Sequence, residues 1–363
     1  MLTAAERPAA RAAWIALQQQ LDDPGLMCSW EWTGTWLEHY GDVVAHRFVV
    51  GEDERGVRGI ALVAEPRLRR LRPPTIVLGT AGEPHGSSVF VERNRLLVHP
   101  DDRAAFAAAL LDELEADGRW QRMRFDGMVP SDADALLGER PDAKIRVDEC
   151  PVANLAQGAG SDKDAHGDED AFASLPSGTR RRVRQSLKRL GPLETEWAQT
   201  APVAGAMLEQ LIELHQAHWH EQGQSGAFAS DRFSAFHRDL VRQLVPMRRA
   251  ALFCVRQEAR TIACLYGLID GKRLLFYQSG LLRNDDNRVR VGLVAHALFM
   301  QACREHGLSE YDFLAPAARY KRELAGDSEQ LVWAELERPG LRLRLQEAAR
   351  RARRLGGGAR PLG

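Results

Sequence analysis

Hydrophobic and polar residues alternate along the second half of the chain with periods that predict both helices and strands. Val183, Leu187 and Leu190, for example, fall on one face of a helix. Such spacing predicts helices at residues 178–190, 203–222, 231–244 and 292–305, with a short one near 320. Short apolar runs predict strands at 251–255, 260–268, 274–279, 310–314 and 330–335. Asp270-Gly271 is typical of a hairpin turn, because both residues tolerate positive φ.

The first half repeats this order of elements. Its predicted helices lie at residues 10–21, 29–39, 102–116 and 133–137. Its predicted strands lie at 46–50, 57–64, 75–78, 122–125 and 144–148. Each half therefore contains helices, a β-meander, a helix, a strand, a short helix and a final strand, which predicts an α+β fold present twice. The alternative is two unrelated α+β domains.

A short corner motif is also repeated. Residues 125–130 read FDGMVP and residues 311–316 read YDFLAP, so both contain an aromatic residue, an aspartate and then a proline. A short helix is predicted after each corner, but only the second carries the pair Tyr320-Lys321. We interpret the motif as a sign of tandem duplication in which the first copy is degenerate and the second retains the chemistry.

Length and composition predict two domains. The 363 residues are 44% hydrophobic and 27% charged, which is ordinary for globular proteins. Residues 157–170 are rich in Asp, Glu and Gly and have almost nothing to bury, so we interpret them as a flexible linker. We expect an N-terminal domain at 1–156, the linker at 157–170, a second domain at 171–338, and a basic C-terminal helix and tail at 339–363.

Charge and cysteine content narrow the possible functions. The net charge of -1 gives no overall attraction to nucleic acid or membrane. The five cysteines are scattered without a CxxC pair, which argues against a disulfide framework or a zinc site and favours a reducing compartment. No signal-peptide core is evident, and no apolar run approaches the roughly 20 residues of a membrane span. We therefore expect a cytoplasmic protein.

Three segments of the second half resemble a known family. They are LIELHQAHWHEQGQSGAF (211–228), LLFYQSGLL (274–282) and YDFLAPAARYKREL (311–324). With the order of elements, they resemble the GNAT acyltransferase fold present twice. In detail they resemble the CelD/BcsL family of bacterial acetyltransferases, relatives of the FemAB peptidyltransferases. The resemblance implies that an acyl-thioester lies between two strands that splay apart. Where family members have a glycine-containing loop before Tyr-Lys, this chain has Ala315-Pro316.

The resemblance also implies a donor site for acetyl-CoA at the start of the helix 292–305. There the pyrophosphate would meet backbone amides and the positive end of the helix dipole. Aligned on Gly292, the usual Gln/Arg-x-x-Gly-x-Gly/Ala pattern meets valine at both Val289 and Val294. Arg288 and Arg290 are candidate phosphate ligands, and the alternative is that both are solvated loop arginines.

Candidate catalytic groups come from two strand ends. Backbone amides near Gln278-Ser279 are candidates to stabilise the oxyanion. Tyr320 is a candidate acid for the departing thiolate, and Lys321 could neutralise an anionic substrate. Alternatively, Tyr320 packs under the sheet and Lys321 is a surface charge. Asp312 could orient this pair, although its counterpart in the first corner favours a structural role such as capping the next turn.

Histidines on the helix 203–222 supply candidate acceptor contacts. His215 and Trp219 fit the family's Leu-His-x-x-x-Trp pattern, and each could equally be a core residue. His215 and His218 are three residues apart, but no HExxH arrangement accompanies them, so we predict no metal site.

Two basic runs, 179–190 and 341–355, could contact a polyanion: RNA, an anionic membrane face or a nucleotide-linked sugar. The alternative is a helix with a solvated basic face. No GxSxG elbow, Walker loop or Rossmann fingerprint follows a predicted strand, so the hydrolase, NTPase and dehydrogenase classes lack support.

The sequence therefore predicts an acyltransferase of double GNAT fold, with its site in the second domain. It would transfer acetyl from acetyl-CoA to an amino or hydroxyl group, without a metal. The family's association with exopolysaccharide and envelope synthesis implies a small-molecule or glycan-precursor acceptor. Two alternatives remain open: a FemAB-like aminoacyltransferase that uses aminoacyl-tRNA, and a non-catalytic binding protein in which both copies have lost activity.

Overall fold

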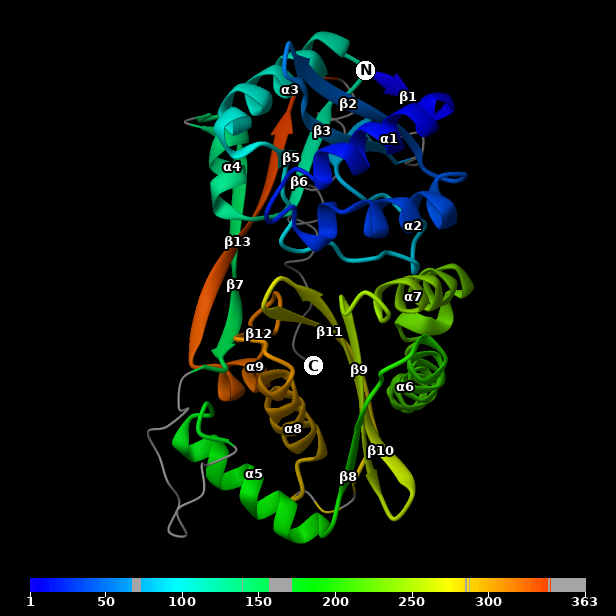
Figure 1. Cartoon of the computed structure of the whole chain (residues 1–363), viewed down its shortest axis with the longest axis vertical. Helices are drawn as coiled ribbons and strands as arrows, with labels where there is room; N and C mark the ends of the chain where they lie inside the picture. The colour runs from blue at the N-terminus through cyan, green and yellow to red at the C-terminus, as the bar shows by residue number, and fades with distance from the viewer. Residues whose placement is uncertain are drawn as a thin grey trace, which may run out of the picture.

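A single mixed β-sheet runs through both halves of the chain in the computed structural model (Figure 1). The structure describes residues 1–66, 73–138, 140–156, 172–284, 286, 288–338 and 340. The strand order is β1-β2-β3-β4-β6-β13-β7-β12-β11-β10-β9-β8, with β5 paired to β3. The predicted linker at 157–170 and the predicted basic helix at 341–355 lie outside the described residues.

The first half contains the elements that its periodicity predicts. Its α-helices are α1 (Arg7–Gln18), α2 (Trp30–Tyr40), α3 (Arg103–Asp117) and α4 (Pro130–Leu137), and its 3-10 helices are η1 (Ala4–Glu6), η2 (Leu26–Cys28) and η3 (Pro100–Asp102). Its strands are β1 (Leu2–Thr3), β2 (Ala45–Asp53), β3 (Gly56–Glu65), β4 (Thr75–Leu78), β5 (Leu97–Val98), β6 (Arg122–Met128) and β7 (Lys144–Asn154). The two-residue strands β1 and β5 are too short to produce a periodic signal.

The second half follows the same plan. Its helices are α5 (Ser177–Leu190), α6 (Ala201–Glu221), η4 (Ala227–Ala229), α7 (Asp231–Leu244), α8 (Val291–Glu305) and α9 (Arg319–Leu324). Its strands are β8 (Glu194–Trp197), β9 (Ala250–Gln257), β10 (Arg260–Asp270), β11 (Arg273–Leu281), β12 (Glu310–Asp312) and β13 (Asp327–Glu337). Gly271 has a φ of 60° between β10 and β11, as the predicted hairpin turn requires. The short strand β8 was not predicted.

The pairing of the strands repeats between the halves. In each half, an antiparallel meander ends in a strand that pairs in parallel with a later strand. That later strand follows α3 in the first half and α8 in the second. β4 pairs with β6 in this way, and β11 pairs with β12. The repeated order that the sequence predicts is thus matched by a repeated hydrogen-bonding pattern.

The last strand of each half crosses into the other half. β13 pairs antiparallel with both β6 and β7, and the end of β7 pairs with β12. β7 and β13 together form a long ribbon that runs from the first half down to α9 in the second half (Figure 1). We expected the strand at 330–335 to belong to the second domain alone, but in the structure it pairs with strands of the first half. Strand periodicity cannot reveal such an exchange, because it identifies a strand and not its partner.

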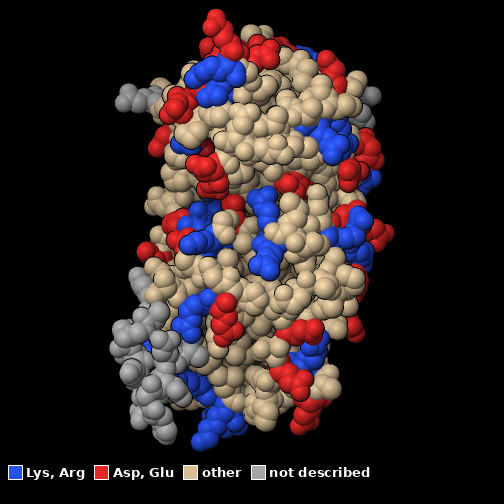
Figure 2. Space-filling model, in the orientation of Figure 1, with Lys and Arg blue, Asp and Glu red and all other residues tan. Residues whose placement is uncertain are grey.

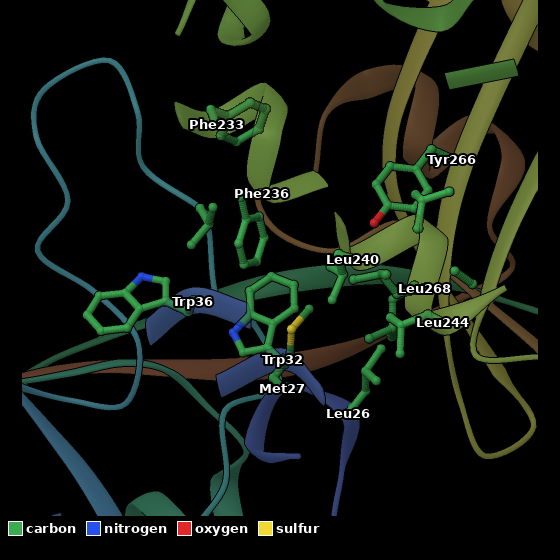
Figure 3. Packing of buried hydrophobic residues seen from close by; sticks show 14 of the residues in the cluster. Leu26, Met27, Trp32, Trp36, Phe233, Phe236, Leu240, Leu244, Tyr266 and Leu268 are labelled. Carbon is green, nitrogen blue, oxygen red and sulfur yellow. The ribbon is translucent and has the colours of Figure 1, made fainter. Parts of the chain in front are cut away.

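One hydrophobic cluster also spans the halves. Trp32 and Trp36 of α2 lie beside Phe236, Leu240 and other apolar residues of α7 and β10 (Figure 3). The rings of Trp32 and Phe236 meet edge to face with centroids 5.2 Å apart, a favourable arrangement for aromatic pairs. Burial of apolar surface therefore holds the halves together in addition to the shared strands.

The two corner motifs have different structures. Asp126 forms an ion pair with Arg124 on the same strand, and Pro130 is the first residue of α4. Asp312 is fully buried and accepts a hydrogen bond from the Leu314 amide at 2.8 Å. The second corner continues through a cis Ala315-Pro316 bond before α9 begins. The repeated sequence is therefore not a repeated local structure.

Asp312 belongs to a network of ion pairs between the halves. Its carboxylate contacts Arg93 from the first half and, at 3.3 Å, Arg273 of β11. Glu329 of β13 joins both arginines, at 2.6 Å from Arg93 and 2.7 Å from Arg273. Burial opposes the change, but the hydrogen bonds from Arg273 and Arg93 lower the pKa of Glu329 to about 2. In this network each carboxylate is paired with both arginines, as buried charges require.

Cys254 and Cys264 are joined by a disulfide across the hairpin of β9 and β10. Their Cα atoms lie 4.3 Å apart, because the strand register places these residues opposite each other. The scattered cysteines argued against a disulfide framework, and that interpretation missed this single pair. Spacing motifs such as CxxC do not detect cross-strand partners. Within the described residues, every helix is too short or too polar to cross a bilayer.

The twin aspartates provide a test of the network. Asp312→Asn should lower the free energy of unfolding by about 3 kcal/mol, because it removes one partner of a buried ion pair. Asp126→Asn removes a half-buried ion pair with Arg124 and should cost less, about 1 kcal/mol. Urea denaturation of both variants measures the difference. Equal effects would contradict a special role for Asp312.

Candidate functional site

A cleft of about 810 Å³ opens where β11 parts from its parallel neighbour. β11 pairs with β12 only from Arg273 to Leu275, so residues 276–281 continue beyond the end of β12. The cleft lies between this part of β11, α6, the start of α8 and α9. Its lining includes many of the predicted site residues, namely His215, Trp219, Gln278, Ser279, Arg290, Gly292 and Tyr320. Arg288, Asp312 and Lys321 are not part of the lining.

The wall formed by β11 is irregular. The register with β10 shifts between Phe276 and Gln278, so Tyr277 is an extra residue on this strand. The Ser279 amide donates to the side-chain oxygen of Gln278 at 3.0 Å. The Ser279 carbonyl and the His215 ring lie within hydrogen-bonding distance, at 3.1 Å. The Ser279 amide, one of the backbone donors predicted to stabilise an oxyanion, is therefore already engaged by a side chain.

His215 connects three segments around the cleft. Its Nδ1 donates to the Ser279 carbonyl of β11, and its Nε2 accepts from the Ala227 amide at 3.4 Å. This arrangement requires a neutral ring, and burial lowers the pKa of His215 accordingly. A side chain at Gly280 would collide with the α6 backbone, since its Cβ would lie 2.3 Å from the Leu211 carbonyl oxygen. His215 thus holds α6 tightly against β11, and Trp219 extends the same wall.

The helix α8 directs its N-terminus into the cleft. Arg290 is the N-cap residue, and its amide donates to the Ser186 hydroxyl of α5 at 3.2 Å. The first amides of any α-helix have no acceptor within the helix, so those of Val291 to Leu293 can bind an anion. A Cβ on Gly292 would lie 3.0 Å from Leu281, so the helix passes close to β11. Arg288 instead forms an exposed ion pair with Asp286, at 2.9 Å, and lies outside the cleft.

Tyr320 and His296 form a stacked pair in the cleft. The ring centroids lie 5.8 Å apart with an interplanar angle of 29°. Although Tyr320 is 42% exposed, the partial burial of its ring raises the pKa of Tyr320 to about 12, so its hydroxyl remains protonated at neutral pH. His296 was not among the predicted site residues, although a histidine within the apolar run VGLVAHALFM is an available signal. Glu323, another lining residue, was also missed.

Lys321 lies beside Tyr320 in sequence but does not face the cleft. Its ammonium donates to the backbone carbonyls of Leu314 and Ala315, at 2.9 and 3.4 Å. Burial lowers the pKa of Lys321, and the nearby Glu92 carboxylate opposes that change. This geometry corrects the expectation that Lys321 meets a substrate anion: the side chain supports the loop after β12. Asp312 is likewise buried below this loop rather than beside the cleft.

Comparison with known proteins assigns the fold. Residues 177–322 match the family model of the acetyltransferase (GNAT) domain. The whole chain has a tandem GNAT-like fold. Comparison with curated protein sequences gives no significant match.

Solved structures of similar fold extend over almost the whole chain. FemX superposes with a TM-score of 0.59 at 12% identity, covering 93% of this chain and 97% of FemX. The C-terminal domain of a putative lysylphosphatidylglycerol synthetase from Agrobacterium fabrum gives 0.54 at 15% identity, with 94% and 96% covered. L-PGS from Bacillus licheniformis gives 0.53 at 13% identity, with 90% and 97% covered. At these identities the likeness concerns the fold alone.

The basic helix α5 lies next to the cleft, because it contacts two of the lining residues, Arg290 and Glu323. Glu323 joins it to α9, because its carboxylate accepts from Arg182 at 3.1 Å and its carbonyl accepts from Thr179 at 2.5 Å. A shallow groove on the outer side of α5 is lined by Arg180, Arg181, Arg184 and Lys188, among others. The predicted basic face of the run 179–190 is therefore at the surface and next to the candidate donor site.

A second cleft, of about 700 Å³, is lined mainly by residues of the first half and shares Phe90 with the first cleft. Phe90 is 68% exposed, an unusual position for a large apolar side chain. Charged residues of both signs line this cleft, including Arg124, Arg146 and Asp148. Burial raises the pKa values of two further lining residues, Glu83 and Glu92, to about 7. Figure 2 shows basic and acidic side chains gathered near the middle of one face of the molecule.

Metal ligation has no support from side-chain placement in the part of the chain that the structure describes. No group of three or more His, Cys, Asp or Glu side chains is arranged there to hold a metal ion.

The position of Lys321 leads to a prediction about stability. Lys321→Met should reduce the free energy of unfolding by about 2 kcal/mol, because it leaves two buried carbonyls without their charged donor. Arg322→Met is a matched control, because Arg322 is the next residue of the same helix and its side chain is exposed. This substitution should change the free energy of unfolding by less than about 0.5 kcal/mol. Chemical denaturation measures both. An unaffected Lys321→Met variant would show that the loop does not depend on this ammonium.

Proposed function

We propose that the second half is a GNAT-type acyltransferase that transfers acetyl from acetyl-CoA to an amino or hydroxyl group. The observation that carries this proposal is the meeting of three features in one cleft: the unpaired edge of β11, the N-terminus of α8 and the Tyr320 hydroxyl. An acyl-thioester with an anionic tail needs all three features. The edge of β11 can bind its amide-rich chain, the N-terminus of α8 can bind its phosphates, and the Tyr320 hydroxyl can protonate its leaving thiolate.

In this proposal the donor spans the cleft from α8 to β11. Its pyrophosphate binds the first-turn amides of α8, with Arg290 as a charged neighbour. Gly292 supports the assignment, because the absence of a side chain lets a ligand approach the helix closely. The thioester then lies along β11 beside Tyr320, where the two strands have separated.

The chemistry is direct transfer with both substrates bound. The acceptor nitrogen or oxygen attacks the thioester carbonyl carbon and forms the new bond, and the carbonyl oxygen takes the negative charge. The carbonyl then re-forms as the carbon–sulfur bond breaks. Tyr320 gives its proton to the departing thiolate, water takes the proton that the acceptor loses, and solvent reprotonates Tyr320.

The second cleft supports a charged, polar acceptor. It adjoins the donor cleft at Phe90 and offers both carboxylates and guanidinium groups, which suit a molecule with several polar substituents. A glycan precursor of the kind associated with the CelD/BcsL family fits this description. We also propose that the protein belongs to that family and is located in the cytoplasm, where it has access to acetyl-CoA.

An aminoacyl-tRNA-dependent transferase is the second candidate. The basic face of α5, a helix that contacts the cleft residues Arg290 and Glu323, favours it, because a nucleic acid bound in the cleft could continue along this helix. The valines at positions 289 and 294, where GNAT domains usually carry a phosphate-binding pattern, favour it as well. The fold likeness to FemX is consistent with either candidate.

Substitution at Gly292 tests the donor. Gly292→Asp should abolish acetyl-CoA binding, because a carboxylate at the helix N-terminus repels the phosphates. Gly292→Ala is the control for bulk: its methyl group would meet only the movable end of Leu281, so most of the affinity should remain. Isothermal titration calorimetry measures both. If the wild type binds aminoacyl-tRNA and not acetyl-CoA, the second candidate replaces the first.

Substitution at Tyr320 tests the acid. Tyr320→Phe should lower kcat roughly 100-fold and leave the Kd of acetyl-CoA almost unchanged, because it removes an interaction made only during the reaction. Asp134→Ala, on the corresponding short helix of the first half, should leave kcat unchanged. Steady-state kinetics with a panel of amine acceptors measures the effect. Normal turnover by Tyr320→Phe would remove Tyr320 from the mechanism.

A further inference from the structure

His296 has one ring nitrogen fixed by the protein and the other available to the cleft. Its Nδ1 lies 2.8 Å from the Tyr311 hydroxyl of β12. The residue is only 3% exposed, yet it lines the donor cleft. No hydrogen bond joins Nε2 to another residue in the described part of the chain. Nε2 is therefore the atom through which His296 can contact a ligand.

Tyr311 determines which nitrogen of His296 carries the proton. The Tyr311 side chain is fully buried, and His296 Nδ1 is the hydrogen-bond partner of its hydroxyl among the described residues. A buried phenol must donate its proton, because an unpaired O–H in the interior is costly. The Tyr311 hydroxyl therefore donates to Nδ1, which makes Nδ1 the acceptor and leaves the ring proton on Nε2.

The surroundings keep this ring neutral and still. Burial, with a smaller contribution from the Lys321 ammonium, lowers the pKa of His296 to about 3. Phe276 and Phe313 pack against the ring at centroid distances of 4.6 and 5.4 Å, and Tyr320 stacks on it. A ring held on these sides cannot turn to exchange its nitrogens. It presents a fixed, uncharged N–H donor.

The other donor expected at the acyl group is already engaged. The Ser279 amide, on the opposite wall of the cleft, donates to the Gln278 side chain. Negative charge that develops on a thioester carbonyl oxygen needs a donor placed in advance, because a prearranged hydrogen bond costs no reorganisation during the reaction. His296 meets this requirement in the structure as it stands.

We propose that His296 donates a hydrogen bond from Nε2–H to the acyl carbonyl oxygen of the thioester donor, and that Tyr311 is the positioning residue that sets its tautomer. The inference deepens the proposed acyltransferase function and rests on it. It assigns two roles to the stacked pair: His296 stabilises the oxyanion, and Tyr320 protonates the thiolate. No charged group is needed at the carbonyl.

Nitrogen-15 NMR of the histidine side chains tests the tautomer without any ligand. His296→Gln identifies the His296 signals by their loss from the spectrum. The wild type should show a neutral ring protonated at Nε2 from pH 5.5 to 8, and Tyr311→Phe should shift the ring toward the Nδ1–H form. A wild-type ring protonated at Nδ1, or titrating within this range, would overturn the inference.

Kinetics of matched variants test the role of the donor. His296→Leu removes the N–H and should lower kcat roughly 100-fold, with the Kd of acetyl-CoA changed by less than about threefold. His296→Gln keeps an N–H donor near the position of Nε2 and should recover part of the loss. Equal kcat for the Leu and Gln variants, or wild-type kcat for both, would overturn the inference.

The two arms separate failure of the inference from failure of the proposed function. An Nε2–H ring in a protein that neither binds acetyl-CoA nor transfers acetyl would reject the proposed function, and with it the contact to a thioester, while leaving the tautomer assignment intact. An active enzyme with an Nδ1–H ring would reject the inference and leave the proposed function standing. The NMR arm needs neither a ligand nor turnover, so it gives a result on the tautomer even if no acetyl transfer is detected.

Discussion

The buried carboxylate of Asp312 determines the geometry on which the rest of the structure depends. It lies where β12 ends, and it pairs there with Arg93 from the first half and Arg273 of β11. A carboxylate without partners in the interior would be too costly to keep, so these contacts fix the place where β11 and β12 part. The same carboxylate holds the Leu314 amide and thus the loop that leads to Tyr320. One interaction positions the cleft, its loop and the neighbouring half.

Local patterns predicted the elements and much of the cleft, because both depend on residues close in sequence. Apolar periodicity located the long helices and strands, and the segments around His215, Gln278 and Gly292 proved to line one cavity. The direction of Lys321 could not be predicted. It depends on the backbone carbonyls of a loop in which Leu314 has a φ of 57°. No residue type in that loop predicts such a backbone conformation. His296 was missed because its significance comes from Tyr311, on another element.

The two halves show how one topology can support different sites. Each has a meander that ends in a parallel pair, but the residues around the two pairs differ in character. The cleft in the second half combines aromatic rings, histidines and a helix N-terminus, whereas the cleft lined mainly by the first half contains many ionisable groups. Phe90 belongs to both linings, so a molecule in either cleft contacts the same side chain. This arrangement suits two substrates that must meet.

The exchange of β7 and β13 has a consequence for synthesis on the ribosome. β6 of the first half pairs with β13, which begins only at Asp327, near the end of the chain. A nascent chain that has emerged through β7 therefore exposes strand edges that have no partner yet, and such edges are prone to aggregate. Neither half can complete its sheet until the last strand arrives. The two halves must therefore fold late and as one unit. The contacts between residues distant in sequence also slow folding.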